Sequence, residues 1–374
     1  MQNWVIENGT ALIDGELATR NVCITDGVFS DTASANASSF DAEGCYVLPG
    51  IIDIHGDAFE RIMEPRPGVF FDKEIALHEA DRQMISNGIT TAYHGLGVSW
   101  EPGVRDMNNS RAIVEAWSNL KDSLYCDTHL NLRWETFALD ERTQALDWLE
   151  RFPGSVLSVN DHASAFRGLA ADHPRIIRMA KRIGISPEDA AGLLESLFAR
   201  SEEVPGAVEE TCRQAVKLGA KVFAHDETSV EQRDYHRELG MSVSEFPMTA
   251  ETARAAVSNG EHVVMGAPNV VRGGSQNNAL CAATAIRENM CTVIASDYYY
   301  PAQLIAAFKL VDTGVVGLAN AWKLVSSSPA EAVGLGDRGI IQDGLRGDLV
   351  LVDAQTRQVR AVFTAGKMAL RLSA

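Results

Sequence analysis

Strand-like hydrophobic runs alternate with amphipathic helical patterns through the middle of the chain. Helical patterns at 76–87 and 207–218, each followed by a glycine, separate two of these runs from the next. Eight strands with intervening helices are typical of a (β/α)8 TIM barrel, which we predict for residues 49–337; an α/β doubly wound open sheet is the alternative. Most of the eight runs end in polar or charged residues, and the runs lie at 48–57, 90–95, 129–135, 156–162, 221–227, 241–246, 263–268 and 292–298.

The two ends of the chain have a different pattern from the middle. Residues 1–48 contain short β segments separated by turn residues such as Asp26-Gly27, and residues 338–374 contain further β segments separated by glycines. These ends predict one small split β-sandwich domain. The segment near 173–205 is unusually helical, with Ser186 as a cap, and we predict that it is an insertion on the active face of the barrel.

The predicted barrel strands end in imidazole and carboxylate side chains. Because barrel enzymes carry their functional residues at the carboxyl ends of the strands, these side chains should meet at one mouth. Strand alternation supports this, since it places Arg133 and Glu135 on one face of the third strand. Imidazoles and carboxylates are ligands of divalent metals, so the set predicts a metal site. The strand-end groups are His55-Gly56-Asp57, Glu135, Asp161-His162, His225-Asp226-Glu227 and Asp297.

The remaining histidines are separated by their place in the pattern. His94 and His129 lie on barrel strands, and their roles stay open. The other four lie outside the strand-end pattern and are interpreted as surface or core residues: His78, His173, His236 and His262.

Composition and charge exclude several classes of function. The 374 residues include 33 Lys and Arg against 50 Asp and Glu, a net charge of −17, which disfavours a nucleic-acid or membrane partner. No signal-peptide pattern begins the chain, and no hydrophobic run reaches the ~18 residues of a membrane span. The six cysteines are widely spaced, which favours reduced thiols and a cytoplasmic location. We therefore expect a small-molecule substrate, and a homo-oligomer is the usual expectation.

Several motifs resemble a known superfamily. Residues 48–55, Leu-Pro-Gly-Ile-Ile-Asp-Ile-His, resemble the first barrel strand of the amidohydrolase superfamily, and residues 337–350 look like its return to the split β domain. Residues 265–275, 296–299, 244–247 and 64–67 resemble one subgroup, the alpha-D-ribose 1-methylphosphonate 5-triphosphate diphosphatases of the carbon–phosphorus lyase pathway. The resemblance covers nearly the whole chain and implies metal-dependent hydrolysis of the triphosphate to the 5-phosphate and pyrophosphate.

The resemblance also implies roles for individual residues. Asp297 would be the catalytic residue that activates water, and it would also bind metal. The donor set suits zinc first, with manganese, iron or nickel as alternatives, and leaves open whether one or two ions bind. The superfamily has His-x-His where this chain has His55-Gly56-Asp57, as the subgroup does. The implied metal ligands are His55, Asp57, Glu135, His162, His225 and Asp297.

A phosphorylated substrate needs cations or backbone N–H groups near its anionic oxygens. The candidates for substrate binding are Arg272, Gly273, Gly274, Ser275, Arg133 and Arg66. Each has a structural alternative. The glycines of 272–275 could simply form a turn, Arg133 could pair with a barrel carboxylate, and Arg66 could lie in a surface loop.

Three departures from the subgroup are expected to line the pocket and concern the substrate rather than the metal. They are residues 163–168, Glu227 and the pair Tyr93-His94. Two alternative functions follow. One is hydrolysis of a C–N bond, as in amidohydrolases and deaminases, and the other is a non-catalytic barrel scaffold. The scaffold is disfavoured because every expected strand end keeps a ligand-type residue.

Overall fold

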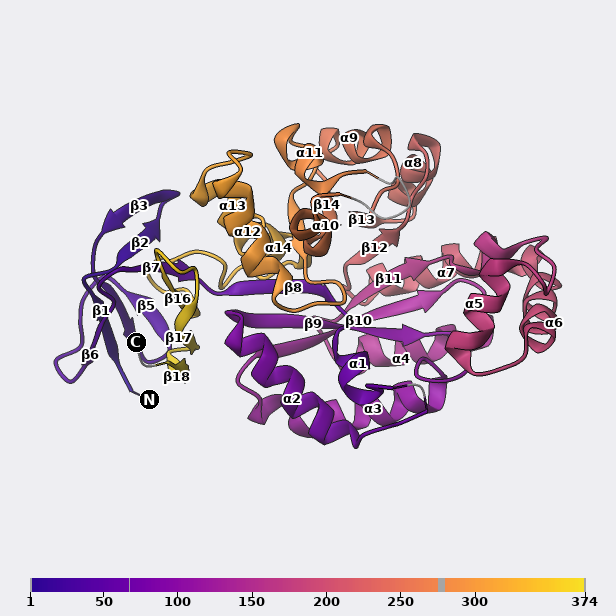
Figure 1. The fold of residues 1–374 in the computed structure, drawn as a ribbon, viewed down its shortest axis with the longest axis horizontal. Helices are drawn as coiled ribbons and strands as arrows, with labels where there is room; N and C mark the ends of the chain where they lie inside the picture. Colours follow the sequence, from indigo (N-terminus) through magenta and orange to yellow (C-terminus); the bar gives the residue numbers. More distant parts are fainter. Residues whose placement is uncertain (1, 67, 275–279, 373–374) are drawn as a thin grey trace.

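The computed structural model describes residues 2–66, 68–274 and 280–372 and contains a barrel of eight parallel strands in chain order (Figure 1). Two backbone hydrogen bonds of 2.9 Å, from Asp57 N to Asp297 O and from Asp297 N to His55 O, join the first strand to the chain after the last. The predicted TIM barrel is therefore confirmed, and an open sheet is wrong. The strands are β8 (Ile51–Gly56), β9 (Ile89–Val98), β10 (Asp127–Glu135), β11 (Val156–Asn160), β12 (Val222–His225), β13 (Met241–Glu245), β14 (His262–Gly266) and β15 (Val293–Ala295).

Helices cover the outside of the barrel, and several begin at side-chain caps. Asp72 accepts hydrogen bonds from two N–H groups at the start of α2, and Ser186 caps α6 as predicted. No helix in the described part of the chain is long and apolar enough to cross a membrane. The helices are α1 (Phe59–Met63), α2 (Lys73–Ser86), α3 (Met107–Leu120), α4 (Arg142–Arg151), α5 (Pro174–Ile183), α6 (Pro187–Phe198), α7 (Val204–Lys217), α8 (Val230–Glu238), α9 (Ala250–Ser258), α10 (Ala267–Arg272), α11 (Ala282–Arg287), α12 (Ala302–Asp312), α13 (Leu318–Lys323) and α14 (Ser327–Val333), with short 3₁₀ turns η1 (Lys121–Ser123), η2 (Leu139–Glu141), η3 (Ala163–Phe166) and η4 (Ser201–Glu203).

Both ends of the chain form the β structure that lies beside the barrel (Figure 1). The two sheets share one hydrophobic core, in which Phe363 contacts Trp4 and Phe40 edge to face at ring distances of 5.3 and 5.9 Å. The predicted split β-sandwich is confirmed. Its four-stranded sheet has the order β5 (Val28–Ser30), β4 (Val22–Thr25), β1 (Trp4–Glu7), β6 (Ser38–Asp41), and its six-stranded sheet has the order β18 (Lys367–Arg371), β17 (Val359–Thr364), β16 (Leu349–Asp353), β7 (Cys45–Pro49), β2 (Thr10–Ile13), β3 (Glu16–Thr19).

Helices α5 and α6 extend the loop that follows β11. They lie at the end of the barrel opposite the terminal β sheets, and the arrowheads of β9, β10 and β11 point toward them (Figure 1). The two helices have their own small core, which includes Ile176 and Leu194 and contacts Trp100 and Phe166. The helical segment predicted near 173–205 is thus found beside the carboxyl ends of the strands.

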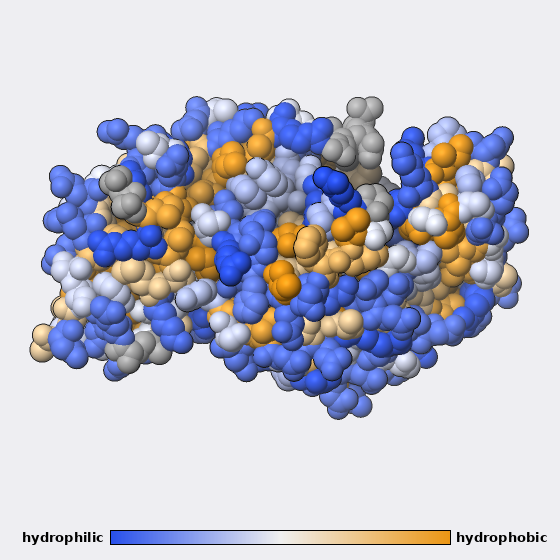
Figure 2. All heavy atoms as spheres, turned by 60° about the horizontal axis from the view of Figure 1, so that its bottom comes forward, coloured by the Kyte–Doolittle hydropathy of each residue, from blue (hydrophilic) through white to orange (hydrophobic). Residues whose placement is uncertain are grey.

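The surface shown in Figure 2 is mainly hydrophilic and carries separate hydrophobic patches. Exposed hydrophobic side chains also follow α1 along the chain, at Val69, Phe70, Phe71 and Ile75. A homo-oligomer stays a prediction. All six cysteines are free thiols, as expected.

Gly50 joins the sandwich to the first barrel strand at a point where the backbone passes very close to Thr90. A Cβ atom built at Gly50 would lie 2.1 Å from Thr90 Oγ1 and 2.9 Å from Thr90 Cβ. We expect Gly50→Ala to lower the free energy of unfolding by about 1–3 kcal/mol, because such overlap forces backbone movement. Gly192→Ala in α6 is the control. It meets open space and should leave the urea midpoint unchanged or raise it, and equal losses in both variants would contradict this account.

Candidate active site

The carboxyl ends of the barrel strands and α5 surround a cavity of about 420 Å³. A cavity of this size suits a small molecule. The residues that line it are His55, Asp57, Glu101, Arg105, Arg133, His162, Ala165, Phe166, Arg175, Arg182, His225, Phe246 and Asp297. Strand ends that are far apart in the sequence therefore meet in one place, as the barrel prediction required.

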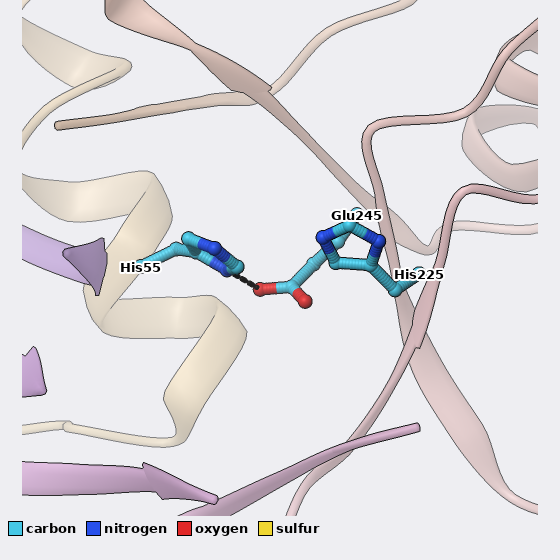
Figure 3. A group of neighbouring side chains, drawn as sticks. All are labelled: His55, His225 and Glu245. Carbon is cyan, nitrogen blue, oxygen red and sulfur yellow. Dashed lines mark hydrogen bonds and ion pairs between the residues drawn. The ribbon is translucent and has the colours of Figure 1, made fainter. Parts of the chain in front are cut away.

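His55 and His225 meet a buried carboxylate at the bottom of this cavity (Figure 3). His55 Nδ1 lies 2.8 Å from Glu245 Oε1, and Ser158 Oγ donates to Glu245 Oε2 at 2.9 Å. Burial raises the pKa of Glu245, but His55, His225 and Ser158 together lower it by more, so the net shift is downward. Glu245 is therefore an ionised, fully buried acceptor at the end of β13.

A second group shares His225 with the first. One ligand atom from each of His162, His225 and Asp226 lies within 4.8 Å of the others, and the same limit holds for His55, His225 and Glu245. His162 also bonds Glu135 through both its backbone N–H and its ring Nδ1. Glu135 is thus the partner that orients His162.

The side chain of His225 indicates that the histidines and carboxylates of these two groups fit a divalent metal. His225 Nδ1 is buried and makes no hydrogen bond in the described part of the chain, although Asp226 Oδ1 lies 3.3 Å away. Burial lowers the pKa of His225, which favours the neutral imidazole that metals bind. A neutral imidazole nitrogen without a partner, between carboxylates and other imidazoles, is the chemistry of a metal ligand.

Asp297 lies at the cavity with an unusual backbone. Its φ is 57°, and φ is also positive at Asp226 and Phe246, the residues that follow β12 and β13. A left-handed backbone costs about 1–2 kcal/mol at a non-glycine residue, and such strain is concentrated at functional sites. Burial raises the pKa of Asp297, and Asp57 adds to the shift against the opposing effect of His55. A raised pKa makes this carboxylate a better proton acceptor near neutral pH.

Four arginines line the cavity, although the chain as a whole is acidic. Arg133 Nη1 lies 3.0 Å from Asp57 Oδ2, and Arg105 binds Glu60 through two bonds of 2.9 Å. Arg182, from α5, binds Glu101 through two bonds of 2.6 and 2.7 Å. Arg175, also from α5, completes the set. Guanidinium groups in this number favour an anionic ligand.

The structure brings together most of the predicted metal ligands. His55, Asp57, His162, His225 and Asp297 all line the cavity. Within the described ranges, the clusters that meet metal-ligand geometry use the three histidines with Glu245 or Asp226 and include none of Asp57, Glu135 and Asp297. Asp57 faces two guanidiniums instead, since Arg105 Nη2 also lies 3.4 Å from its Oδ2. Direct metal binding by these three carboxylates stays a prediction.

The predicted substrate-binding residues lie in different places, some at the cavity and some away from it. Arg133 lines the cavity, and it also pairs with a barrel carboxylate as the alternative expected. Arg272 is exposed at the end of α10, and Gly273 is the left-handed residue that ends this helix. Arg66 is exposed between α1 and α2. Among the described residues, Arg66 and residues 272–274 do not line the cavity. Ser275 lies outside the described ranges. Substrate binding by Arg66 and by residues 272–275 stays a prediction.

Two of the three expected pocket departures do not line the cavity. Glu227 is fully buried on the α8 side, where it bonds Arg233, His236 and Ser244. Tyr93 stacks on His129 at a ring distance of 4.8 Å. The expectation is wrong for Glu227, which bonds other side chains away from the cavity, and for Tyr93-His94, which pack within the barrel, whereas Ala165 and Phe166 do line the cavity.

His94 and His129, whose roles the sequence left open, lie outside the cavity lining. His94 is buried with its ring edge to face with Phe59, and burial together with His129 lowers the pKa of His94 to about 4. His129 Nε2 lies 3.6 Å from Asp127 Oδ1. Both histidines belong to the packing of the barrel in the described structure.

The sequence analysis missed two kinds of site residue. Glu245 follows a hydrophobic run and could have been found by the rule that identified the other strand ends. Arg105, Arg175 and Arg182 lie in the segments after the second and fourth barrel strands, and the helical periodicity of α5 marks its buried side but not the cavity that its arginines line.

Comparison with known proteins gives full-length similarity but no match to a family model. The alpha-D-ribose 1-methylphosphonate 5-triphosphate diphosphatase of Escherichia coli is 28% identical over 385 residues, which cover 97% of this chain and 99% of that protein. An adenine deaminase of a Methylobacterium species is 26% identical over 96% of this chain, but the match spans only 56% of the deaminase.

Solved structures share the fold at lower identity. An amidohydrolase structure has a TM-score of 0.64 at 14% identity and covers all of both chains. A D-hydantoinase has a TM-score of 0.61 at 15% identity, covering 99% of this chain and 95% of its own. These structures confirm the fold alone, and membership of the amidohydrolase superfamily stays a prediction.

Proposed function

We propose that this chain is a hydrolase of the amidohydrolase superfamily and that it cleaves alpha-D-ribose 1-methylphosphonate 5-triphosphate to the 5-phosphate and pyrophosphate with the help of a divalent metal, with zinc as the first candidate. The observation that carries the proposal is the set of arginines beside the histidine–carboxylate cluster. A triphosphate needs both, because its anionic oxygens require cations and its cleavage benefits from a metal. The full-length similarity to the diphosphatase of Escherichia coli supports the same substrate.

The cluster residues have distinct roles in this proposal. His55, His162 and His225 would hold the metal with Glu245 and Asp226, and Glu135 would orient His162. A bound divalent ion acidifies water and polarises a phosphoryl oxygen. Asp297 accepts the proton of the attacking water, whose oxygen bonds to one phosphorus as the bridging P–O bond breaks. Arg133 stabilises the negative charge that develops on the phosphoryl oxygens.

Hydrolysis of a C–N bond is the second candidate. The similarity to an adenine deaminase favours it, and Arg272, which the triphosphate hypothesis assigned to the substrate, is exposed outside the cavity lining. An uncharged base or cyclic amide, however, has no anionic group that could bind the four guanidiniums around this cavity. Three of these guanidiniums are paired with carboxylates, but Arg175 has no such partner among the described residues, and this arrangement favours the triphosphate.

A substrate panel tests the proposal. The metal-loaded protein would be assayed in parallel with the ribose triphosphate, adenine and a cyclic amide. We expect kcat/KM for the triphosphate to exceed that for the other two by at least about 10³-fold, since a site built for charged groups rejects analogues that leave those groups unpaired. Faster release of ammonia from adenine, or faster opening of the amide, would overturn the proposal in favour of C–N hydrolysis.

A further inference from the structure

Helix α5 contributes two arginines to the rim of the cavity. Arg175 and Arg182 are seven residues apart, so they lie on the same face of the helix. The position of α5 is fixed at its start, where His173 Nδ1 accepts a hydrogen bond of 3.2 Å from the backbone N–H of Arg175, and along its buried side by the small core with α6. The helix thus holds this face against the open end of the cavity.

The four arginines of the cavity differ in how they are neutralised. Arg105, Arg133 and Arg182 each pair with a carboxylate at 3.0 Å or less. Arg175 is exposed and, among the described residues, has no carboxylate within ion-pair distance. Its guanidinium lies 5.4 Å from the ring centroid of Phe166, which also lines the cavity. The aromatic ring supports the guanidinium without neutralising its charge.

We infer that Arg175 is a specificity-determining residue that binds an anionic group at one end of the substrate, either the terminal phosphate or the methylphosphonate. The inference rests on the proposed function, in which both ends of the substrate are anionic. The paired arginines and the histidine cluster would hold the centre of the substrate. An anionic group at one end of the substrate then reaches the unneutralised guanidinium of Arg175 at the rim of the cavity. Because the guanidinium binds phosphoryl oxygens through two donors, a lysine replaces it only in part.

The test compares Arg175→Ala and Arg175→Lys with Lys181→Ala in the metal-loaded enzyme. Lys181 is exposed on the same helix but about 120° around it from Arg175, and it does not line the cavity. We expect Arg175→Ala to raise KM about 10- to 100-fold with little change in kcat, which is the range of one or two charge-assisted hydrogen bonds. Arg175→Lys should fall between, and Lys181→Ala should match the unaltered enzyme.

Two truncated ligands identify the group that Arg175 binds. Ribose 5-triphosphate lacks the methylphosphonate, and ribose 1-methylphosphonate 5-diphosphate lacks the terminal phosphate. Measured as competitive inhibitors, one of them should bind equally well to the unaltered enzyme and to Arg175→Ala, because it lacks the group that the arginine contacts. A KM unchanged by Arg175→Ala, or an equal penalty with both truncated ligands, would overturn the inference.

A binding measurement separates this inference from the proposed function. The affinity for one of two simple anions, inorganic tripolyphosphate or methylphosphonate, measured by calorimetry, should fall in Arg175→Ala whether or not the enzyme hydrolyses the ribose triphosphate. If the unaltered protein does not cleave the triphosphate but this affinity falls, the proposed function fails and the anion site stands. If cleavage proceeds and neither KM nor the affinity for either anion changes, the anion site fails and the function stands.

Discussion

Replacing Asp297 by Asn is expected to lower kcat for triphosphate hydrolysis by about 10²–10⁴-fold, the usual contribution of a general base. Asparagine has the same shape but cannot accept the proton of the attacking water. It also tolerates the left-handed backbone at this position, where φ is 57°, whereas alanine would add strain. The fold and the closure of the barrel should survive, because the bonds at residue 297 that join β8 to the chain after β15 are made by the backbone.

Asp161→Asn is the matched control. Asp161 also follows a barrel strand, but it is exposed, accepts a hydrogen bond from Ser164 N at 3.0 Å and does not line the cavity. Its substitution should leave kcat within about twofold. Steady-state kinetics with thermal unfolding would check both variants. If Asp297→Asn kept more than about a tenth of the activity, Asp297 would not be the base.

The second large effect is expected at Glu245, which the sequence analysis did not assign. Glu245→Gln keeps the volume but removes the charge that faces His55 and His225. We expect metal affinity to fall more than about 10-fold, since even partners of metal ligands contribute that much. Activity should fall with it at limiting metal. Metal content after dialysis, measured by elemental analysis, reports the effect without any assay of turnover.

Glu227→Gln provides the comparison for Glu245→Gln. Glu227 is equally buried, but it lies on the α8 side of the barrel and pairs with Arg233. Glu227→Gln removes one charged partner of the buried Arg233 guanidinium, so it should lower the free energy of unfolding by about 3–5 kcal/mol. The metal content of the folded protein should not change. Equal metal loss in both variants would mean that Glu245 acts only through stability.

The fold was largely predictable because its signals are local and repeated. Each barrel strand is a short hydrophobic run, and β10 alternates as expected, with Leu132 and Trp134 toward the helices and Arg133 at the cavity. Strand β8 departs from a regular register with β9. Asp53 accepts hydrogen bonds from Ser296, while His55 bonds Glu245, and the pairing with β9 shifts register between Asp53 and Gly56. A register shift depends on the neighbouring strand, so the pattern of one strand does not reveal it.

The centre of the site was predictable and its rim was not. His55, His162 and His225 stand at strand ends, which the barrel topology alone brings together. Arg175 and Arg182 reach the same cavity only because α5 and α6 pack on Trp100 and Phe166. The periodicity of α5 marks its buried side but not the cavity beside which it packs, so the sequence favoured Arg272 and its glycines instead.

The most direct test of the central claim follows the products of the metal-loaded protein by phosphorus NMR during incubation with alpha-D-ribose 1-methylphosphonate 5-triphosphate. The account predicts that pyrophosphate and the 5-phosphate appear together in equal amounts, in proportion to the added metal, and that Asp297→Asn suppresses both. Inorganic phosphate released stepwise would contradict a diphosphatase. An unchanged triphosphate, in protein that demonstrably holds its metal, would contradict the substrate itself.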